Sequence, residues 1–218
     1  MTGSARAGQK TWLFDLDNTL HNATPHIFPH INRSMTAYIV EHLRVDEAEA
    51  TQIRQHYWQR YGATLLGLVR HHGTDPNHFL WHTHQFPDLK RMVVFERGLK
   101  AMLRRLPGRK IVFSNAPLHY TEAVLGLTGI AGCFDAVYSV ERIRFQPKPA
   151  PAGFHHLLRA ERLNPRRCIM VEDTLPNLKT AKRLGMKTVW VSTSTRRPPC
   201  VDVQLASVLD LPQRLGWL

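Results

Sequence analysis

The chain has 218 residues, 43% of them hydrophobic and 21% charged, which is the composition of one globular domain or of a domain with an insertion. Its formal net charge is +12, but lysine and arginine are dispersed along the chain. This favours a basic solvated surface, with some attraction for anionic substrates, over a nucleic-acid interface. No stretch approaches the roughly 18 apolar residues of a membrane span, so no membrane partner is expected.

The cysteines and the N-terminal residues bear on the compartment. Residues 1–10 are polar and lack the apolar centre of a secretory signal. Cys133, Cys168 and Cys200 do not have the spacing of a disulfide framework or a metal site, and their odd number fits a reducing compartment. We therefore expect a cytoplasmic protein, with Cys168 buried in an apolar strand.

The first predicted element is a buried strand over residues 11–17 that ends in acidic residues. Apolar residues 12–14 precede Asp15 and Asp17. Side chains alternate along a strand with a period of two, so the two carboxylates point the same way. Two like charges this close repel unless a cation lies between them or one carries a proton, which indicates metal binding or acid–base chemistry. A helix cap or an Asx turn is the alternative.

The segment from 21 to about 94 is predicted to consist of helices. Apolar residues recur at helical spacing between 35 and 43, and residues 47–61 form a second helical stretch. Asp75 followed by Pro76 is a typical start of a further helix. This all-helical stretch follows the first strand directly, so we interpret it as an inserted domain.

From residue 96 onward, helices and strands alternate. The predicted strands are 110–113, 134–140, 167–171 and 188–191, and the predicted helices are 99–106, 117–127, 151–163 and 174–184. Such alternation predicts an α/β fold with a Rossmann-like parallel sheet and helices on both faces. Ligands of these sheets bind beyond the carboxyl ends of the strands.

Polar residues stand at those ends. Ser114 and Asn115 follow the second strand, Lys148 lies between two prolines ahead of a helix, and Glu172 and Asp173 end the strand at 167–171. Because these positions share one edge of the sheet with the first acid pair, they can converge on one site.

This order of an acid pair, a small hydroxyl, a lysine and a second acid pair resembles the haloacid dehalogenase-like (HAD) phosphohydrolase superfamily. The resemblance extends over the chain apart from its polar N-terminal segment. It implies an α/β catalytic core made of residues 1–20 and 95–218. It also implies a helical cap domain, residues 21–94, that closes over the site and selects the substrate.

The resemblance implies a reaction as well, the hydrolysis of a phosphate monoester through an aspartyl-phosphate. Asp15 would be the nucleophile and Asp17 the general acid and base. An acid at position 17 favours phosphoryl transfer, because the true dehalogenases of the family lack it. Mg²⁺ would bind the Asp15 carboxylate, the Asp17 backbone carbonyl and Asp173. Glu172 could support these ligands, and Asn177 stands where many relatives carry another acid.

Further residues would contact the phosphoryl group. Ser114 would donate a hydrogen bond to it, with help from the backbone N–H groups of Asn18 and Asn115, although a helix cap is the alternative for this serine. Lys148 would neutralise both Asp15 and the transferring group.

Substrate selection is expected to depend on the cap. Residues 61–68, Tyr-Gly-Ala-Thr-Leu-Leu-Gly-Leu, are similar to the cap of the pyrimidine 5′-nucleotidase branch. Tyr61 and Thr64 could hold a small ring by stacking and hydrogen bonding. Equally, Tyr61, Leu65 and Leu68 could form the core of the cap itself.

We therefore predict a Mg²⁺-dependent hydrolase of a small phosphorylated metabolite, with UMP and CMP as the expected substrates. One alternative is a phosphatase or phosphomutase for another metabolite, such as phosphoglycolate or a sugar phosphate. Another is a basic nucleic-acid-binding protein on a repurposed fold. The oligomeric state cannot be predicted from these residues.

Overall fold

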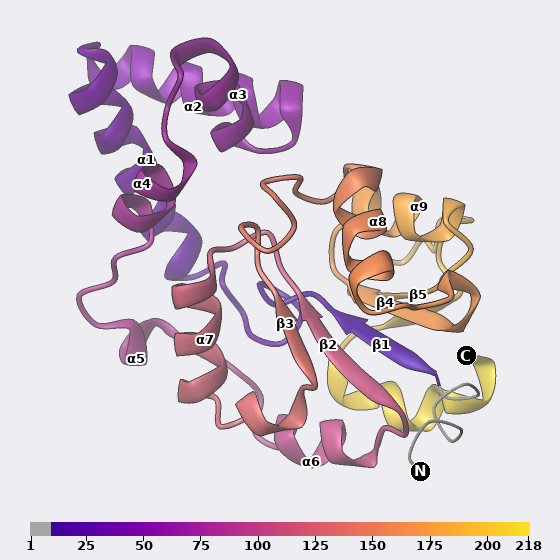
Figure 1. Cartoon of the computed structure of the whole chain (residues 1–218). Coiled ribbons are helices and arrows are strands. Elements are labelled where there is room, and N and C mark those ends of the chain that lie inside the picture. Colours follow the sequence, from indigo (N-terminus) through magenta and orange to yellow (C-terminus); the bar gives the residue numbers. More distant parts are fainter. Residues whose placement is uncertain (1–9) are drawn as a thin grey trace.

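The computed structural model describes residues 10–218, which form an α/β core with a helical insertion beyond one edge of its sheet (Figure 1). Residues 1–9 lie outside the described part, and so does most of the N-terminal segment in which we expect no secretory signal. Among the described residues, no helix combines the length and the apolar character needed to cross a membrane.

The sheet formed by residues 10–218 has six strands, all parallel, in the order β3-β2-β1-β4-β5-β6. The strands are β1 (Thr11–Phe14), β2 (Arg109–Phe113), β3 (Ala136–Tyr138), β4 (Cys168–Glu172), β5 (Lys187–Val191) and β6 (Val203–Leu205). The predicted α/β fold with a parallel sheet is thus confirmed.

The helices agree with the predicted ones to within a few residues. They are α1 (Ile27–Leu43), α2 (Glu47–Tyr61), α3 (Thr64–His72), α4 (Pro76–Thr83), α5 (Leu89–Met92), α6 (Leu99–Arg105), α7 (Leu118–Leu127), α8 (Pro151–Ala160) and α9 (Leu175–Arg183), with the short 3₁₀ helices η1 (Ala131–Cys133), η2 (Pro165–Arg167) and η3 (Val208–Trp217). The start at Asp75–Pro76 is confirmed, because the Asp75 carboxylate accepts hydrogen bonds from the N–H groups of Asn77 and His78.

Alternating strand residues divide the core into two layers. Trp12 and Phe14 of β1 pack on one face of the sheet with α6, α7 and η3. Leu13 of the same strand packs on the other face with α8 and α9. Cys168, as predicted, is buried in this second layer. The two layers fix the sheet from both sides, so its carboxyl edge is a rigid base for a site.

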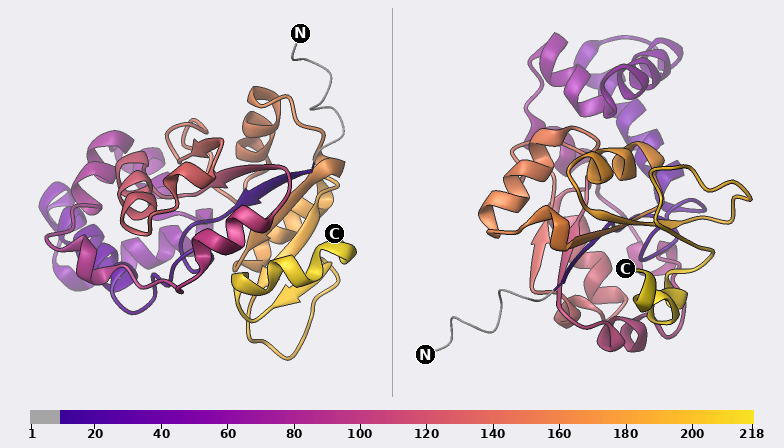
Figure 2. Two further views of the ribbon diagram at one scale, coloured as in Figure 1. Left: turned by 90° about the horizontal axis from the view of Figure 1, so that it is seen from below. Right: turned by 90° about the vertical axis from the view of Figure 1, so that its right-hand side faces the viewer.

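The insertion has a hydrophobic core of its own. Its buried residues are Tyr38, Ile39, Ala50, Leu65, Leu68, Phe79 and Leu80, joined by Val140 from the loop after β3. Figure 2 shows the insertion at one end of the molecule and η3 at the other. A helical insertion with its own core on an α/β core, as predicted, is therefore present.

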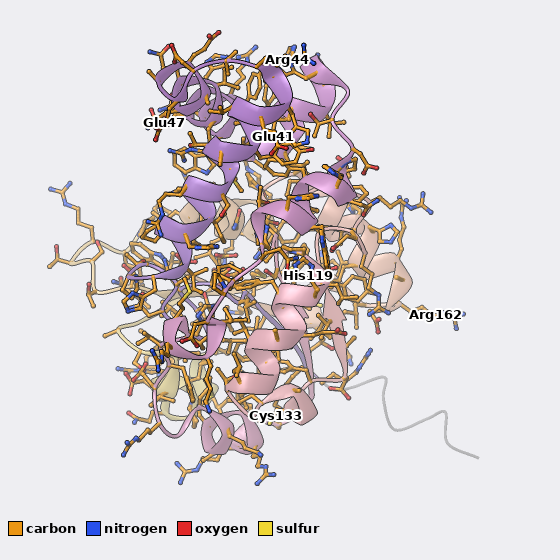
Figure 3. All side chains as sticks on the ribbon, turned by 90° about the vertical axis from the view of Figure 1, so that its left-hand side faces the viewer. Glu41, Arg44, Glu47, His119, Cys133 and Arg162 are labelled. Carbon is orange, nitrogen blue, oxygen red and sulfur yellow. The ribbon has the colours of Figure 1, made fainter. Side chains whose placement is uncertain are left out.

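Two chain segments connect the insertion to the core. Asn22 donates a backbone hydrogen bond to Val94 (2.7 Å), so the two linking segments lie side by side. His119 at the start of α7, labelled in Figure 3, donates through Nε2 to the His84 carbonyl (3.2 Å) where α7 faces the insertion. The limits of the cap at residues 21 and 94 remain predictions.

Several short elements were not predicted, namely β6, η3 and the 3₁₀ helices η1 and η2. β6 has only three residues, which is too short for a strand pattern to emerge from the sequence. η3 contains Pro212, which disfavours a regular helix, and it packs beside α6.

Candidate active site

The loop after β1 is held tightly at the carboxyl edge of the sheet. Asp15 is buried, and its N–H donates to the Val171 carbonyl of β4 (3.0 Å). Asn18 has a left-handed backbone (φ 61°), which Asn tolerates better than most residues. Its side-chain oxygen accepts hydrogen bonds from the N–H groups of Ala23 (2.9 Å) and Thr24 (3.2 Å). The Asn18 side chain thus orders this loop.

Lys148 lies directly beside Asp15. Its Nζ donates to Asp15 Oδ1 (2.6 Å) and to Glu172 Oε2 (2.7 Å). The side chain is fully enclosed, with 1% exposed. Burial alone would lower the pKa of Lys148, but the charges of Asp15 and Glu172 outweigh it and raise that pKa. Lys148 is therefore a permanent cation next to the predicted nucleophile.

Asn115 positions this lysine through its backbone. Asn115 Nδ2 donates to the Lys148 carbonyl (2.9 Å), and the Lys148 N–H donates to Asn115 Oδ1 (2.8 Å). The amide side chain thus clamps the loop that carries the cation. Our prediction for Asn115 concerned only its backbone N–H, so this role of the side chain was missed.

Three carboxylates gather at the same point. Oxygen atoms of Asp15, Glu172 and Asp173 lie within 4.8 Å of one another. Burial, and next the charge of Glu172, raise the pKa of Asp15 to about 7, although Lys148 opposes this. Burial, and next the charge of Asp15, raise the pKa of Asp173 to about 8. One lysine does not balance three acids, so this oxygen-rich cluster fits a further cation such as Mg²⁺.

Asn177 and Trp190 support the second acid pair from behind. Asn177 Nδ2 donates to Glu172 Oε2 (3.0 Å), and the Thr174 N–H donates to Glu172 Oε1 (3.1 Å). Trp190 Nε1 donates to the Asp173 backbone carbonyl (2.7 Å). The amide of Asn177 therefore orients Glu172 without adding charge. Trp190 was not predicted to contact the site, since its apolar strand context gives no such signal.

Asp17 has two partners that sequence analysis missed. Its Oδ1 accepts a hydrogen bond from the Tyr120 hydroxyl (2.7 Å) and lies 2.8 Å from His21 Nε2. Burial, and next the Asp17 charge, raise the pKa of Tyr120, so its hydroxyl is a donor at neutral pH. Tyr120 comes from α7, and no local sequence pattern links it to Asp17.

Ser114 is buried at the end of β2, where its Oγ accepts a hydrogen bond from the Ala116 N–H (3.0 Å). This contact orders the turn before α7, and it leaves the hydroxyl hydrogen as a donor. The residue that caps the start of α7 is Pro117, not Ser114, and the structure describes no side-chain hydrogen bond at this cap. Contact with a phosphoryl group remains a prediction for Ser114.

Tyr61 and Thr64, the two cap residues predicted to contact the substrate, both make hydrogen bonds within the insertion. A Cβ on Gly62 would lie 3.4 Å from Pro149 Cδ, so the turn between α2 and α3 sits over the Lys148 loop. Tyr61, beside this turn, has its hydroxyl 2.6 Å from His71 Nε2. The Thr64 hydroxyl donates to the Arg54 carbonyl of α2 (3.0 Å). These bonds stabilise the packing of α2 on α3, and substrate contact by Tyr61 and Thr64 stays a prediction.

Comparison with known proteins identifies the family. Residues 9–185 match the haloacid dehalogenase-like hydrolase family, so the chain belongs to it. N-acylneuraminate-9-phosphatase of Mus musculus is 28% identical over 174 residues, which is 76% of this chain and 68% of that protein.

Two solved structures share the fold. A HAD phosphatase from Thermococcus onnurineus superposes with a TM-score of 0.66 at 21% identity, over 95% of this chain and 98% of that one. L-2-haloacid dehalogenase from Xanthobacter autotrophicus superposes with a TM-score of 0.60 at 17% identity, over 95% and 98%. Because a phosphatase and a dehalogenase fit about equally well, the fold does not decide the chemistry. The relatives do not single out the pyrimidine 5′-nucleotidases, so that finer resemblance remains a proposal.

Proposed function

We propose that this hydrolase is a Mg²⁺-dependent phosphomonoesterase that works through an aspartyl-phosphate on Asp15. The observation that carries the proposal is the cluster of Asp15, Lys148, Glu172 and Asp173. In it the proposed nucleophile contacts one fixed cation and lies beside oxygen atoms that could bind a second. Phosphate monoesters hydrolyse extremely slowly in water, and such positive charge offsets the repulsion between two anions.

The proposed reaction has two steps. An Asp15 oxygen attacks phosphorus and forms an O–P bond, while the bond to the leaving oxygen breaks and that oxygen takes a proton from Asp17. Asp17 then removes a proton from water, which attacks phosphorus and releases phosphate and the Asp15 carboxylate. Lys148 balances charge on Asp15 throughout. Mg²⁺, held by Asp15, Asp173 and the Asp17 carbonyl, would supply further charge stabilisation of the phosphoryl oxygens.

Dehalogenation is the competing chemistry on this fold. A haloalkanoate loses halide, which departs as an anion and needs no proton. Asp17 is held by two hydrogen-bonding partners and has no evident use in that reaction. The acid at position 17 therefore supports phosphoryl transfer.

For the substrate we propose a pyrimidine nucleoside 5′-monophosphate, on the likeness of residues 61–68 to that branch. The mouse relative, by its name, acts on N-acylneuraminate 9-phosphate, which makes this compound a necessary competitor in any test. Phosphoglycolate and sugar phosphates, including turnover by a phosphomutase, are the other candidates. The cytoplasm remains our prediction for the compartment.

The test is phosphate release from UMP, CMP, AMP, GMP, N-acetylneuraminate 9-phosphate, phosphoglycolate and sugar phosphates, with Mg²⁺ and with a chelator. Asp15→Asn is the control, because it is nearly isosteric and removes the nucleophile. We expect Mg²⁺-dependent turnover, strongest on UMP and CMP, that falls by at least about 1,000-fold in Asp15→Asn. Preference for another phosphate would overturn the substrate assignment alone. Activity that survives in Asp15→Asn would overturn the mechanism.

The net charge of +12 gives a second candidate, nucleic-acid binding. Inactivity on every phosphate, together with steeply salt-dependent binding to generic DNA or RNA, would favour this function over hydrolysis.

A further inference from the structure

Asp17 is half-buried and forms a polar triad with the buried side chains of His21 and Tyr120. The Tyr120 hydroxyl donates to Asp17 Oδ1 (2.7 Å), His21 Nε2 lies 2.8 Å from the same oxygen, and the hydroxyl and Nε2 are 3.3 Å apart. Both contacts end on Oδ1 and neither uses Oδ2. The carboxylate is thus fixed through one oxygen, and the other stays available to a substrate.

The two partners are themselves held rigidly. Tyr120 is 1% exposed, and its ring packs against Phe86 (centroids 5.2 Å apart) and His84 (5.8 Å), so residues of the insertion hold it in place. The His21 side chain is fully enclosed. A hydrogen-bond donor that cannot move holds its acceptor in one orientation. A group that transfers a proton needs such a fixed orientation.

The surroundings of the two His21 ring nitrogens indicate which of them carries the proton. Within the described residues, its buried Nδ1 has no hydrogen-bond partner. An unpaired buried N–H costs more than an unpaired lone pair, and Nε2 faces a carboxylate, so the proton belongs on Nε2. His21 therefore supplies a second donor to Asp17, beside the Tyr120 hydroxyl.

We propose that Tyr120 and His21 are positioning residues that hold Asp17 for proton transfer to the leaving oxygen, which suits the enzyme to phosphate monoesters of alcohols. The inference rests on the proposed function. An alkoxide is a poor leaving group and needs a proton as it departs, whereas a nitrophenolate departs without one. Loss of these positioning contacts should therefore slow the hydrolysis of alkyl phosphates more than the hydrolysis of aryl phosphates.

The experiment compares kcat/KM for the best alkyl phosphate of the substrate panel with kcat/KM for p-nitrophenyl phosphate. We expect Tyr120→Phe to lower the alkyl value by about 10- to 100-fold, part of the 100- to 10,000-fold that general acid catalysis contributes, and the aryl value by less than about 3-fold. Tyr138→Phe is the matched control, because it also removes a buried hydroxyl that donates to a carboxylate, Glu161 Oε1 (2.8 Å), and it should leave the ratio unchanged.

His21 provides an independent variant pair. His21→Gln keeps a donor with the reach of Nε2, whereas His21→Leu keeps only volume. We expect His21→Leu to lose alkyl phosphate turnover selectively and His21→Gln to recover most of it. Circular dichroism identifies any variant that fails to fold. If the variants at one of the two residues, Tyr120 or His21, do not fold, the variants at the other residue provide the test.

The outcomes separate the two proposals. Equal losses on alkyl and aryl substrates, or no loss on either, would overturn the positioning role alone. A wild-type protein without phosphatase activity, or activity retained in Asp15→Asn, would overturn the proposed function and this inference with it.

Discussion

Lys148 and Glu172 form a buried ion pair immediately behind the predicted nucleophile. Lys148 Nζ lies 2.7 Å from Glu172 Oε2, and each side chain is 1% exposed. The same ammonium group donates to Asp15 Oδ1. Glu172 therefore offsets part of the lysine charge, and the Asp15 carboxylate is more basic than a simple pair with Lys148 would leave it. This is a suitable environment for a carboxylate that must attack phosphorus.

The first prediction concerns the loss of that cation. Lys148→Met keeps most of the side-chain volume but leaves the carboxylates of Asp15, Glu172 and Asp173 without their cation. We expect turnover to be lost and the metal-free protein to be destabilised by about 3–5 kcal/mol, the cost of breaking a buried pair. Urea unfolding in a chelator measures this change.

Lys182→Met is the matched control. Lys182 Nζ donates to Asp202 Oδ1 (2.6 Å), but its side chain is 38% exposed, so this pair should contribute less than about 1 kcal/mol. Equal destabilisation by the two variants would contradict the buried, uncompensated cluster.

The second prediction is a pH dependence of the metal-free protein. The pKa values of Asp15 and Asp173 rise from 3.8 to about 7 and about 8 on folding, so the folded state binds more protons than the unfolded state across this window. Stability from these groups is complete at low pH and is lost as the pH rises through 7 and 8. His84, whose pKa falls from 6.5 to about 4 through burial, has the opposite effect, but only below its ordinary pKa.

Thermal unfolding in a chelator between about pH 7.5 and 8.5 isolates the two acids from His84, because this range lies well above the ordinary pKa of His84 and the side chain is almost entirely neutral in both states. We expect the Tm to fall across this range by roughly 2–4 °C for each kcal/mol lost. The slope should flatten in the double variant Asp15→Asn with Asp173→Asn. An unchanged slope in that variant would assign the effect to other groups.

The third prediction concerns Mg²⁺. A ligand that binds only the folded state at about 100 times its Kd adds about 2.7 kcal/mol of stability. We expect Mg²⁺ to raise the Tm of the wild type and to have little effect on Asp173→Asn. Asp202→Asn is the control, since it removes a carboxylate that binds Lys182 outside the cluster and should keep the full response to Mg²⁺. Loss of the response in both variants would contradict a site at Asp173.

The sequence predicted the sheet, most helices and the convergence of Asp15, Lys148 and Asp173, because strand ends of a parallel sheet meet at one edge. Strong apolar runs made these elements predictable, whereas β6 was too short to produce one. Tyr120 could not be assigned, since its contact with Asp17 spans 103 positions and depends on how α7 packs. The side-chain bonds of Asn115 and Trp190 escaped prediction for the same reason: long-range packing determines them.

Close packing between α2 and α3 accounts for one glycine, Gly67, of the unusual cap sequence at residues 61–68. A Cβ on Gly67 would lie 2.1 Å from Tyr57 Cγ and 2.5 Å from Tyr57 Cβ, atoms too close to the α2 backbone to move aside. Gly67→Ala should therefore force α2 and α3 apart and cost about 1–3 kcal/mol, as overpacking does. Gly126→Ala in α7 is the matched control, because nothing lies within 4 Å of its added Cβ, and it should stabilise the protein by up to about 1 kcal/mol. Hydrogen exchange should show the loss of protection by Gly67→Ala confined to α2 and α3. If the two variants are equally stable, close packing of these helices does not explain the glycine, and a role in substrate binding becomes the better interpretation.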